Sequence, residues 1–165
     1  PGGKAFTMAN LMGNKGEILA CDLYPHRVEL IKRTAKRLGL DIIKTAVADA
    51  TEYNPKLGEF DCVLCDVPCS GLGVIRRKPE IKYNALTCLE ELKNIQLSIL
   101  KNAVKYLKKG GKLLYSTCTL RREENEKLVI SFQKEYNDLC KVYEHTFMPH
   151  KDGTDGFYCA LFEKR

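Results

Sequence analysis

Three short apolar stretches of this chain each end in an aspartate, and this pattern constrains the fold more than any other feature. The stretches cover residues 17–21, 42–48 and 60–65, and the aspartates that follow them are Asp22, Asp49 and Asp66. A short apolar run bounded by polar residues is typical of a buried strand. Helix-like segments alternate with these strands, which favours parallel pairing. We therefore expect an α/β fold, mostly parallel, with the aspartates at the sheet edge where such folds bind ligands.

The spacing of apolar residues also predicts the other elements of the chain. Helices are expected over residues 3–12, 25–38, 86–107 and 123–136. A further strand is expected over residues 112–115, and two more over residues 141–147 and 157–163. No helical pattern separates the last two strands, so an antiparallel hairpin is predicted at the edge of the sheet.

The composition is that of one globular domain. The chain has 165 residues, of which 44% are hydrophobic and 29% are charged. No apolar run approaches the roughly 18 residues that span a membrane, so no membrane partner is expected. Several of the eight cysteines fall inside strand-like runs, which favours reduced thiols and a cytoplasmic location. Three histidines without paired spacing give no reason to expect a metal site.

Basic residues outnumber acidic ones, and the net charge of +6 favours a polyanionic partner. Many of the basic residues lie on predicted helices, where a solvated surface explains them equally well. Arg76, Arg77 and Lys78 differ because they follow the segment from Asp66 to Gly73 in a predicted loop. We expect these three side chains to contact RNA phosphates.

Two of the aspartates suit a nucleoside. Asp22 stands at a strand end before a helix, where α/β proteins bind ribose hydroxyls, and Asp49 could accept a hydrogen bond from an adenine amino group. Each could equally be a helix cap or a turn residue. No Gly-x-Gly-x-x-Gly motif follows the first strand, so an adenosyl group without a pyrophosphate is favoured over a dinucleotide.

Cys69 and Cys118 both lie just beyond predicted strand ends, and Asp66 lies near Cys69. Two thiols and a carboxylate suit a pyrimidine ring, because C5 of cytosine becomes nucleophilic only after a thiolate adds to C6. One thiol would attack while a second group assists. A carboxylate that faces N3 and the exocyclic amine would favour the addition, and Asp66 is the candidate.

At this point the chain resembles the Sun (Fmu-type) family of ribosomal RNA cytosine-C5 methyltransferases over its whole length. The motifs that carry the resemblance are, in order, Pro1-Gly2-Gly3-Lys4, Asp22, Asp49, Asp66-Val67-Pro68-Cys69-Ser70-Gly71-Leu72-Gly73, Arg76-Arg77-Lys78-Pro79-Glu80-Ile81-Lys82, Ser116-Thr117-Cys118-Thr119 and Asp155-Gly156-Phe157-Tyr158.

The resemblance implies a Rossmann-like methyltransferase domain over residues 1–165 that uses S-adenosylmethionine and modifies the ribosomal RNA of the small subunit. It implies that Cys118 is the C6 nucleophile and that Cys69 assists product release. Asp22 is then expected on the ribose and Asp49 near the adenine. The residues expected to contact the cofactor are Pro1, Gly2, Gly3, Lys4, Asp22, Arg27, Asp49 and Asp66.

Members of this family carry an apolar strand before Pro-Gly-Gly-Lys and RNA-binding domains before that strand, and residues 1–165 contain neither. We therefore expect the first strand of the sheet to be missing and these residues alone to bind the cofactor weakly and methylate little.

Two alternative interpretations stay open. In the first, Cys69 is the nucleophile, as in DNA cytosine methyltransferases, and Cys118 only packs. In the second, the chain is a non-catalytic adenosyl- or RNA-binding module in which both cysteines are structural. An amino-group methyltransferase is disfavoured, because Cys69 stands where that class carries an aromatic residue.

Overall fold

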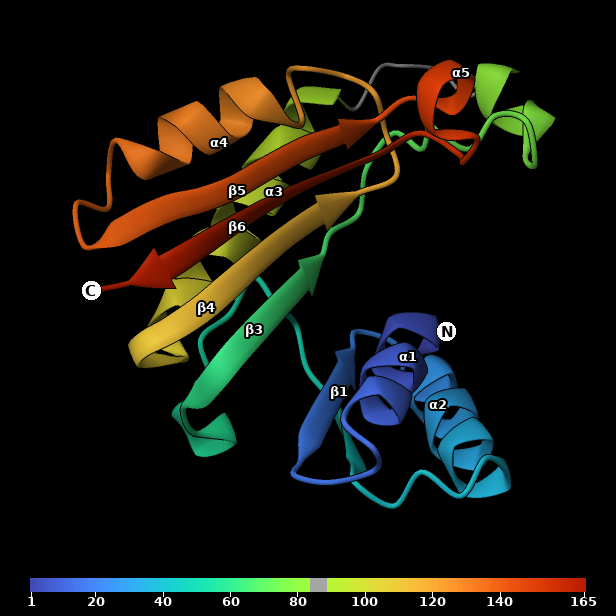
Figure 1. The fold of residues 1–165 in the computed structure, drawn as a ribbon, viewed down its shortest axis with the longest axis vertical. Helices are drawn as coiled ribbons and strands as arrows, with labels where there is room; N and C mark the ends of the chain where they lie inside the picture. Colours follow the sequence, from blue (N-terminus) through green and yellow to red (C-terminus); the bar gives the residue numbers. More distant parts are fainter. Residues whose placement is uncertain (84–88) are drawn as a thin grey trace. The chain divides into compact units, whose positions relative to one another are not determined.

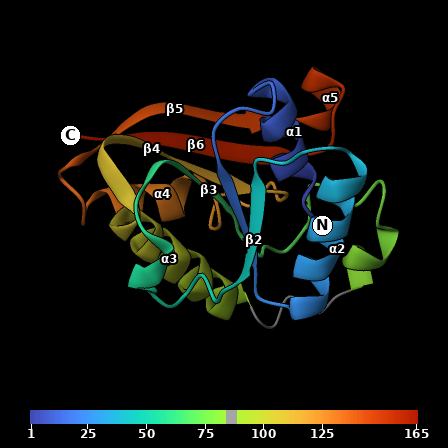
Figure 2. The ribbon, with the colours of Figure 1, turned by 90° about the horizontal axis from the view of Figure 1, so that it is seen from below.

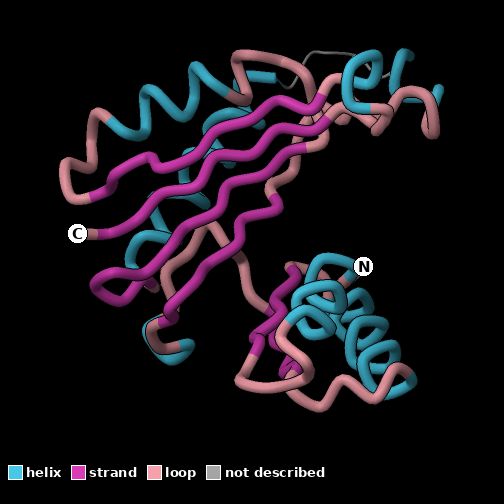
Figure 3. The backbone as a smooth tube through the Cα atoms, in the orientation of Figure 1, coloured by secondary structure: helices cyan, strands magenta, loops and turns pink. Residues whose placement is uncertain are grey.

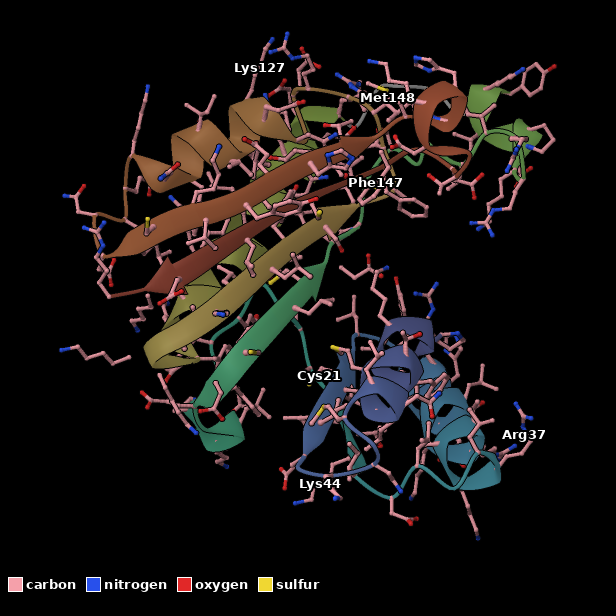
Figure 4. All side chains as sticks on the ribbon, viewed as in Figure 1. Cys21, Arg37, Lys44, Lys127, Phe147 and Met148 are labelled. Carbon is pink, nitrogen blue, oxygen red and sulfur yellow. The ribbon has the colours of Figure 1, made fainter. Side chains whose placement is uncertain are left out.

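The computed structural model describes residues 1–83 and 89–165, and these form two compact units, Pro1–Glu52 and Tyr53–Arg165 (Figure 1). The first unit contains α1 (Gly3–Leu11), β1 (Ile18–Asp22), α2 (Pro25–Arg37) and β2 (Ile43–Val47). Strands β1 and β2 pair in parallel, with Ile18 opposite Ile43 and Asp22 opposite Val47. Labels on Cys21 and Lys44 mark these two strands in Figure 4.

The first unit has a small core of its own between the two helices and the two strands. Ala9 of α1 and Ala35 of α2 are buried in it together with Leu40. Helix α2 begins with Pro25 at its first position, which suits the fixed φ of proline. The buried residues of α2 recur at helical spacing and are Val28, Ile31 and Ala35.

The second unit contains a four-stranded sheet in the order β3-β4-β6-β5. Its elements are η1 (Pro55–Leu57), β3 (Phe60–Asp66), η2 (Pro79–Tyr83), α3 (Leu89–Lys105), β4 (Leu107–Thr117), α4 (Glu126–Gln133), β5 (Leu139–Phe147), α5 (Pro149–Asp152) and β6 (Phe157–Lys164). Strands β3 and β4 are parallel, and β6 is antiparallel to both β4 and β5. The arrow of β6 accordingly points against the other three in Figure 1.

Helices α3 and α4 lie on one face of this sheet (Figure 2). Alternate residues of β4 face them, so Leu113 and Tyr115 are fully buried. Phe132 of α4 meets Phe162 of β6 edge to face, with ring centroids 5.5 Å apart. This core fixes β3 and β4, the two strands that lead into the cysteine loops.

The alternation of strands and helices and the antiparallel pair at the C-terminal end are confirmed. Among residues 1–83 and 89–165, β1 pairs only with β2 and β3 pairs only with β4. No helix in these residues is long and apolar enough to cross a membrane. The expected missing strand stays a prediction.

The predicted helix over residues 86–107 was wrong at its end, and residues 86–88 lie outside the described part of the chain. Helix α3 stops at Lys105, and Leu107 begins β4 opposite Phe60. The amide of Phe60 donates to Tyr106 O at 2.7 Å, so the backbone has already turned into the sheet there. Gly110, at φ 74°, allows the chain to turn again before the pairing resumes.

Two other boundaries also differ from the prediction. Helix α4 spans Glu126–Gln133 rather than residues 123–136, because Asn125 has a non-helical backbone, at φ −113° and ψ −107°. A short helix, α5, stands between the last two strands, directly after Phe147 and Met148 (Figure 4). Pro149 begins it, and the Asp152 carboxylate accepts a hydrogen bond from the Met148 amide at 2.6 Å.

Candidate functional site

Two loops at one edge of the second unit's sheet bring Cys69 and Cys118 together. Asp66 at the end of β3 lies opposite Ser116 of β4, and the strands are parallel, so both loops leave the same edge (Figure 3). The two sulfur atoms lie 3.3 Å apart, and both cysteines are half-buried. Residues separated by 49 positions in the sequence are therefore in direct contact.

The environment keeps Cys69 protonated near neutral pH. Its hydrogen bond with Cys118 raises the pKa of the Cys69 thiol strongly, and burial and the neighbouring Cys118 charge add to this. Cys69 is therefore suited to act as a proton donor toward a group beside it.

Asp66 ends β3 with an exposed side chain, and it accepts a hydrogen bond from the Ser116 hydroxyl at 3.3 Å. Cys65 precedes it on the opposite, buried face of the strand. Burial, with a smaller effect from the Asp66 charge, raises the pKa of the Cys65 thiol to about 12. Cys65 therefore packs as an uncharged core residue, and Asp66 is the polar group of the strand end.

A buried polar cluster, which we call the Glu124 cluster, lies beside the two cysteines and consists of Ser70, Gln96, Thr119 and Glu124. Glu124 has no exposed surface. Its carboxylate accepts hydrogen bonds from the Ser70 amide at 2.9 Å, from the Ser70 hydroxyl at 2.6 Å and from Gln96 Nε2 at 3.0 Å. The cluster joins the loop after β3, helix α3 and the segment after β4.

Asn125, which is also fully buried, holds the strand end around Cys118. Its Oδ1 accepts a hydrogen bond from the Thr117 hydroxyl at 2.7 Å, and its Nδ2 donates to Thr119 O at 2.9 Å. The residues on both sides of Cys118 are thus tied to one side chain.

Two glycines allow three chain segments to meet at the site. The amide of Gly73 donates to Cys118 O at 3.0 Å, and the amide of Gly156 donates to Gly73 O at 2.7 Å. A Cβ atom on Gly73 would lie 2.0 Å from Gly156 O and 2.8 Å from Cys118 O. Gly73 is needed here for close backbone approach, and this explains a glycine that fits no dinucleotide motif.

The three predicted RNA-binding residues are exposed, and two of them also pair within the protein. Arg77 Nε lies 2.5 Å from Asp155 Oδ2, and Arg76 NH2 lies 3.6 Å from Asp155 Oδ1. Arg76 keeps 74% and Arg77 keeps 64% of its side chain exposed. Asp155 therefore anchors the loop while leaving both guanidinium groups open to solvent, and Lys78 is exposed as well.

The predicted cofactor residues of the first unit gather around the ends of β1 and β2. Asp22 accepts a hydrogen bond from the Tyr24 amide through one oxygen, and the other oxygen lies 3.8 Å from Arg27. The exposed Asp49 carboxylate accepts two hydrogen bonds from Thr51, which lower the pKa of Asp49.

The start of α1 also suits a bound ligand. Gly2 has φ 87°, which turns the chain into the helix, and a Cβ atom added to Gly3 would meet nothing within 4 Å. Pro1 and Lys4 are exposed. Two acceptor carboxylates and an open helix start fit an adenosyl group.

Sequence reasoning missed Glu124, Asn125 and Gln96. Glu124 lies between Glu123 and Glu126 in a charged stretch that is typical of the solvated start of a helix. The one available signal was its position just after the Ser-Thr-Cys-Thr segment. In residues 1–83 and 89–165, no group of three or more His, Cys, Asp or Glu side chains could hold a metal ion.

Comparison with known proteins identifies the family of the chain. The sequence model of the 16S rRNA methyltransferase RsmB/F family matches residues 1–163. The probable ribosomal RNA small subunit methyltransferase B of Bacillus subtilis strain 168 is 40% identical, and the match covers 100% of this chain and 41% of that protein. The ribosomal RNA small subunit methyltransferase F of Erwinia tasmaniensis is 34% identical, over 99% of this chain and 38% of that protein.

Among solved structures, NSun6 from Pyrococcus horikoshii with SFG has a TM-score of 0.89 and 33% identity, over 99% of this chain and 45% of that chain. This match confirms the Rossmann-like methyltransferase fold. The chain spans about 41% of the length of the Bacillus relative. With the whole-length match to the family model, these similarities confirm the resemblance read from the motifs: the chain belongs to the RsmB/F family of 16S rRNA methyltransferases.

Proposed function

We propose that the protein carrying this chain transfers a methyl group from S-adenosylmethionine to C5 of a cytosine in small-subunit ribosomal RNA. Residues 1–165 would form its catalytic domain. The observation that carries the proposal is the 3.3 Å contact between Cys69 and Cys118 at two parallel strand ends, beside Asp66. A pair of thiols has a use in C5 chemistry and none in transfer to an amino group.

In the proposed reaction, the Cys118 thiolate adds to C6 of the cytosine, and the electrons of the C5–C6 double bond become available at C5. C5 then takes the methyl group, a base removes the C5 proton, and the C6–sulfur bond breaks to restore the double bond. The raised pKa of Cys69 supports an assisting role, because a thiol that keeps its proton can donate it to the departing Cys118 sulfur.

Asp66 would act on the pyrimidine ring. Its exposed carboxylate could accept a hydrogen bond from the exocyclic amine and favour a protonated N3, which draws electrons away from C6. Ser116, whose hydroxyl donates to Asp66, would hold the carboxylate in place.

The cofactor, when bound, supplies an electrophilic methyl group. Asp22 would accept hydrogen bonds from its ribose hydroxyls and Asp49 from its adenine amine, while Gly2, Gly3 and Lys4 would form the loop at its amino acid end. Pro1, Arg27 and Asp66 complete the proposed contacts. Arg27 would do so by holding Asp22, since its guanidinium lies 3.8 Å from that carboxylate.

The competing assignment makes Cys69 the nucleophile, and the sulfur contact alone fits either order. Trapping on RNA that carries 5-fluorocytosine separates the two, because fluorine at C5 cannot leave as a proton does and the adduct persists. We expect the whole protein with Cys69→Ala to form the covalent adduct and the whole protein with Cys118→Ala to form none. The opposite pattern would assign the attack to Cys69.

A non-catalytic module is the remaining alternative. If the wild-type protein forms no adduct and leaves no 5-methylcytosine in unmodified small-subunit RNA, both catalytic assignments fail together. Mapping the methylated cytosines in the same RNA would also identify the target nucleotide.

A further inference from the structure

We propose that Glu124 is a positioning residue that holds Cys69 against Cys118 in the geometry needed for catalysis. The inference deepens the proposed function and rests on it. Glu124 would act through the residues beside the two sulfur atoms: Ser70 follows Cys69, and Thr119 follows Cys118.

Glu124 binds Ser70 through both of its carboxylate oxygens. One carboxylate oxygen of Glu124 accepts from the Ser70 amide at 2.9 Å, and the other accepts from the Ser70 hydroxyl at 2.6 Å. Two hydrogen bonds to a carboxylate fix both the position and the direction of the residue that makes them. Because they hold the backbone nitrogen directly after Cys69, they restrict where the Cys69 side chain can point.

Ser70 in turn connects Glu124 to the residue that follows Cys118. The Ser70 hydroxyl has one hydrogen and donates it to Glu124, so in its 2.8 Å contact with Thr119 it must accept the Thr119 hydrogen. Thr119 is fully buried, and its hydroxyl oxygen in turn accepts from the Arg121 amide at 3.3 Å. A single chain of hydrogen bonds therefore runs from Glu124 through Ser70 to the residue after Cys118.

Gln96 connects Glu124 to the residue before Cys69. Gln96 Nε2 donates to Glu124 Oε2 and to Pro68 O at 2.8 Å, and Pro68 directly precedes Cys69. This orientation leaves Gln96 Oε1 buried with no hydrogen-bond partner in the described part of the chain. Both residues that flank Cys69 are therefore held in place, Pro68 by Gln96 and Ser70 by Glu124.

Glu124→Gln is the sharpest perturbation, because it preserves the shape of the side chain. The new amide NH2 group would face either the Ser70 hydroxyl or the donors at Oε2. Facing Ser70, it would force the hydroxyl to accept from residue 124 and donate to Thr119, which reverses the present chain of hydrogen bonds; at Oε2 it would place donor against donor. The loop that carries Cys69 should then shift away from Cys118. A misplacement of about 1 Å can slow a reaction by up to about a hundredfold.

The first readout needs no RNA. In the whole protein, the oxidant diamide takes one proton and one electron from each of the two thiols, so that a Cys69–Cys118 disulfide forms and diamide is reduced to the hydrazine. Mass spectrometry of the linked peptides gives the rate. We expect Glu124→Gln to slow this reaction about tenfold or more. Removal of the Glu124 charge alone would favour the thiolate form of the cysteines and speed disulfide formation. A slower rate therefore indicates that the distance or orientation of the two thiols has changed.

The second readout is catalytic. Single-turnover methyl transfer by Glu124→Gln should fall by at least about tenfold while the affinities for RNA and cofactor stay unchanged. Glu123→Gln is the matched control: it removes the same charge from the adjacent residue, which pairs with Lys127 at the surface and, like Glu124, lies within 4 Å of Arg121 Nε. Both of its rates should equal those of the wild type.

Ser70→Ala keeps the amide contact and removes only the hydroxyl link, so it tests the same chain of contacts with less risk to folding. It should slow disulfide formation to a value between the wild type and Glu124→Gln. Wild-type disulfide rates in both variants would overturn the inference. A wild-type protein that forms the disulfide readily but gives no 5-fluorocytosine adduct would instead refute the proposed function alone.

Discussion

Replacing Gly73 with alanine should break the junction that holds the two cysteine loops together. The added Cβ would lie 2.0 Å from Gly156 O, 2.6 Å from Gly156 C and 2.8 Å from Cys118 O. All three are backbone atoms, so no side chain can rotate away to relieve the contact. Relief requires the chain segments to separate by about 1.5 Å, since nonbonded heavy atoms prefer roughly 3.5 Å or more.

The magnitude follows from what that separation breaks. Overpacking of a buried site costs about 1 to 3 kcal/mol. The hydrogen bonds from Gly73 to Cys118 and from Gly156 to Gly73 would also be weakened, at about 1 kcal/mol each. We therefore expect the free energy of unfolding of the second unit to fall by about 3 to 5 kcal/mol, with slower Cys69–Cys118 disulfide formation.

Hydrogen exchange of peptides around residues 73 and 156, with urea unfolding followed by circular dichroism, measures this loss in the whole protein. Gly110→Ala is the control, since Gly110 has φ 74° but no atom within 4 Å of an added Cβ. It should cost about 1 to 2 kcal/mol from backbone strain alone. A Gly73→Ala variant that loses no more than the control would refute the close-contact argument.

Two further predictions concern charge. Burial raises the pKa of Cys65 from 9.0 to about 12, so between these pH values the folded protein keeps a proton that the unfolded chain releases. The free energy of unfolding should therefore be constant with respect to Cys65 below pH 9 and should fall above pH 9 by about 1.4 kcal/mol per pH unit. Urea unfolding between pH 8 and 10 should show a weaker decline in Cys65→Ala but not in Cys62→Ala, the exposed thiol of the same strand; equal declines in all three proteins would contradict this. Arg76→Ala should weaken RNA binding and reduce the slope of log K against log salt by about 0.7 to 0.9, and an unchanged slope would argue against a phosphate contact.

Much of this architecture could be predicted from local patterns, because strands that end in aspartate and helices with apolar spacing are visible within a few residues. The placement of Cys69 and Cys118 at two strand ends followed from the same patterns. The boundary at Leu107 could not be found in this way, since a leucine continues a helix as readily as it begins a buried strand.

The contacts of the Glu124 cluster beside the cysteines could not be predicted from local sequence patterns either. Glu124, Ser70 and Gln96 come together from positions up to 54 residues apart, and the charged residues around Glu124 predict an exposed side chain rather than a buried one. The pairing of Arg77 with Asp155 likewise depends on the loop path rather than on the charges themselves. Such long-range contacts depend on the tertiary fold, which side-chain type alone does not specify.

The register of β3 and β4 determines where the chain can change in length. Asp66 lies opposite Ser116, so an inserted residue between either one and its cysteine would displace a sulfur by about 3.3 Å along the strand direction. At the opposite end of the same strand pair, the register shifts between Phe60 and Cys62, and the open turn at Gly110 already takes up the extra residues of β4. Insertions should therefore be tolerated next to Gly110, and they should abolish activity between residues 66 and 69 or between residues 116 and 118.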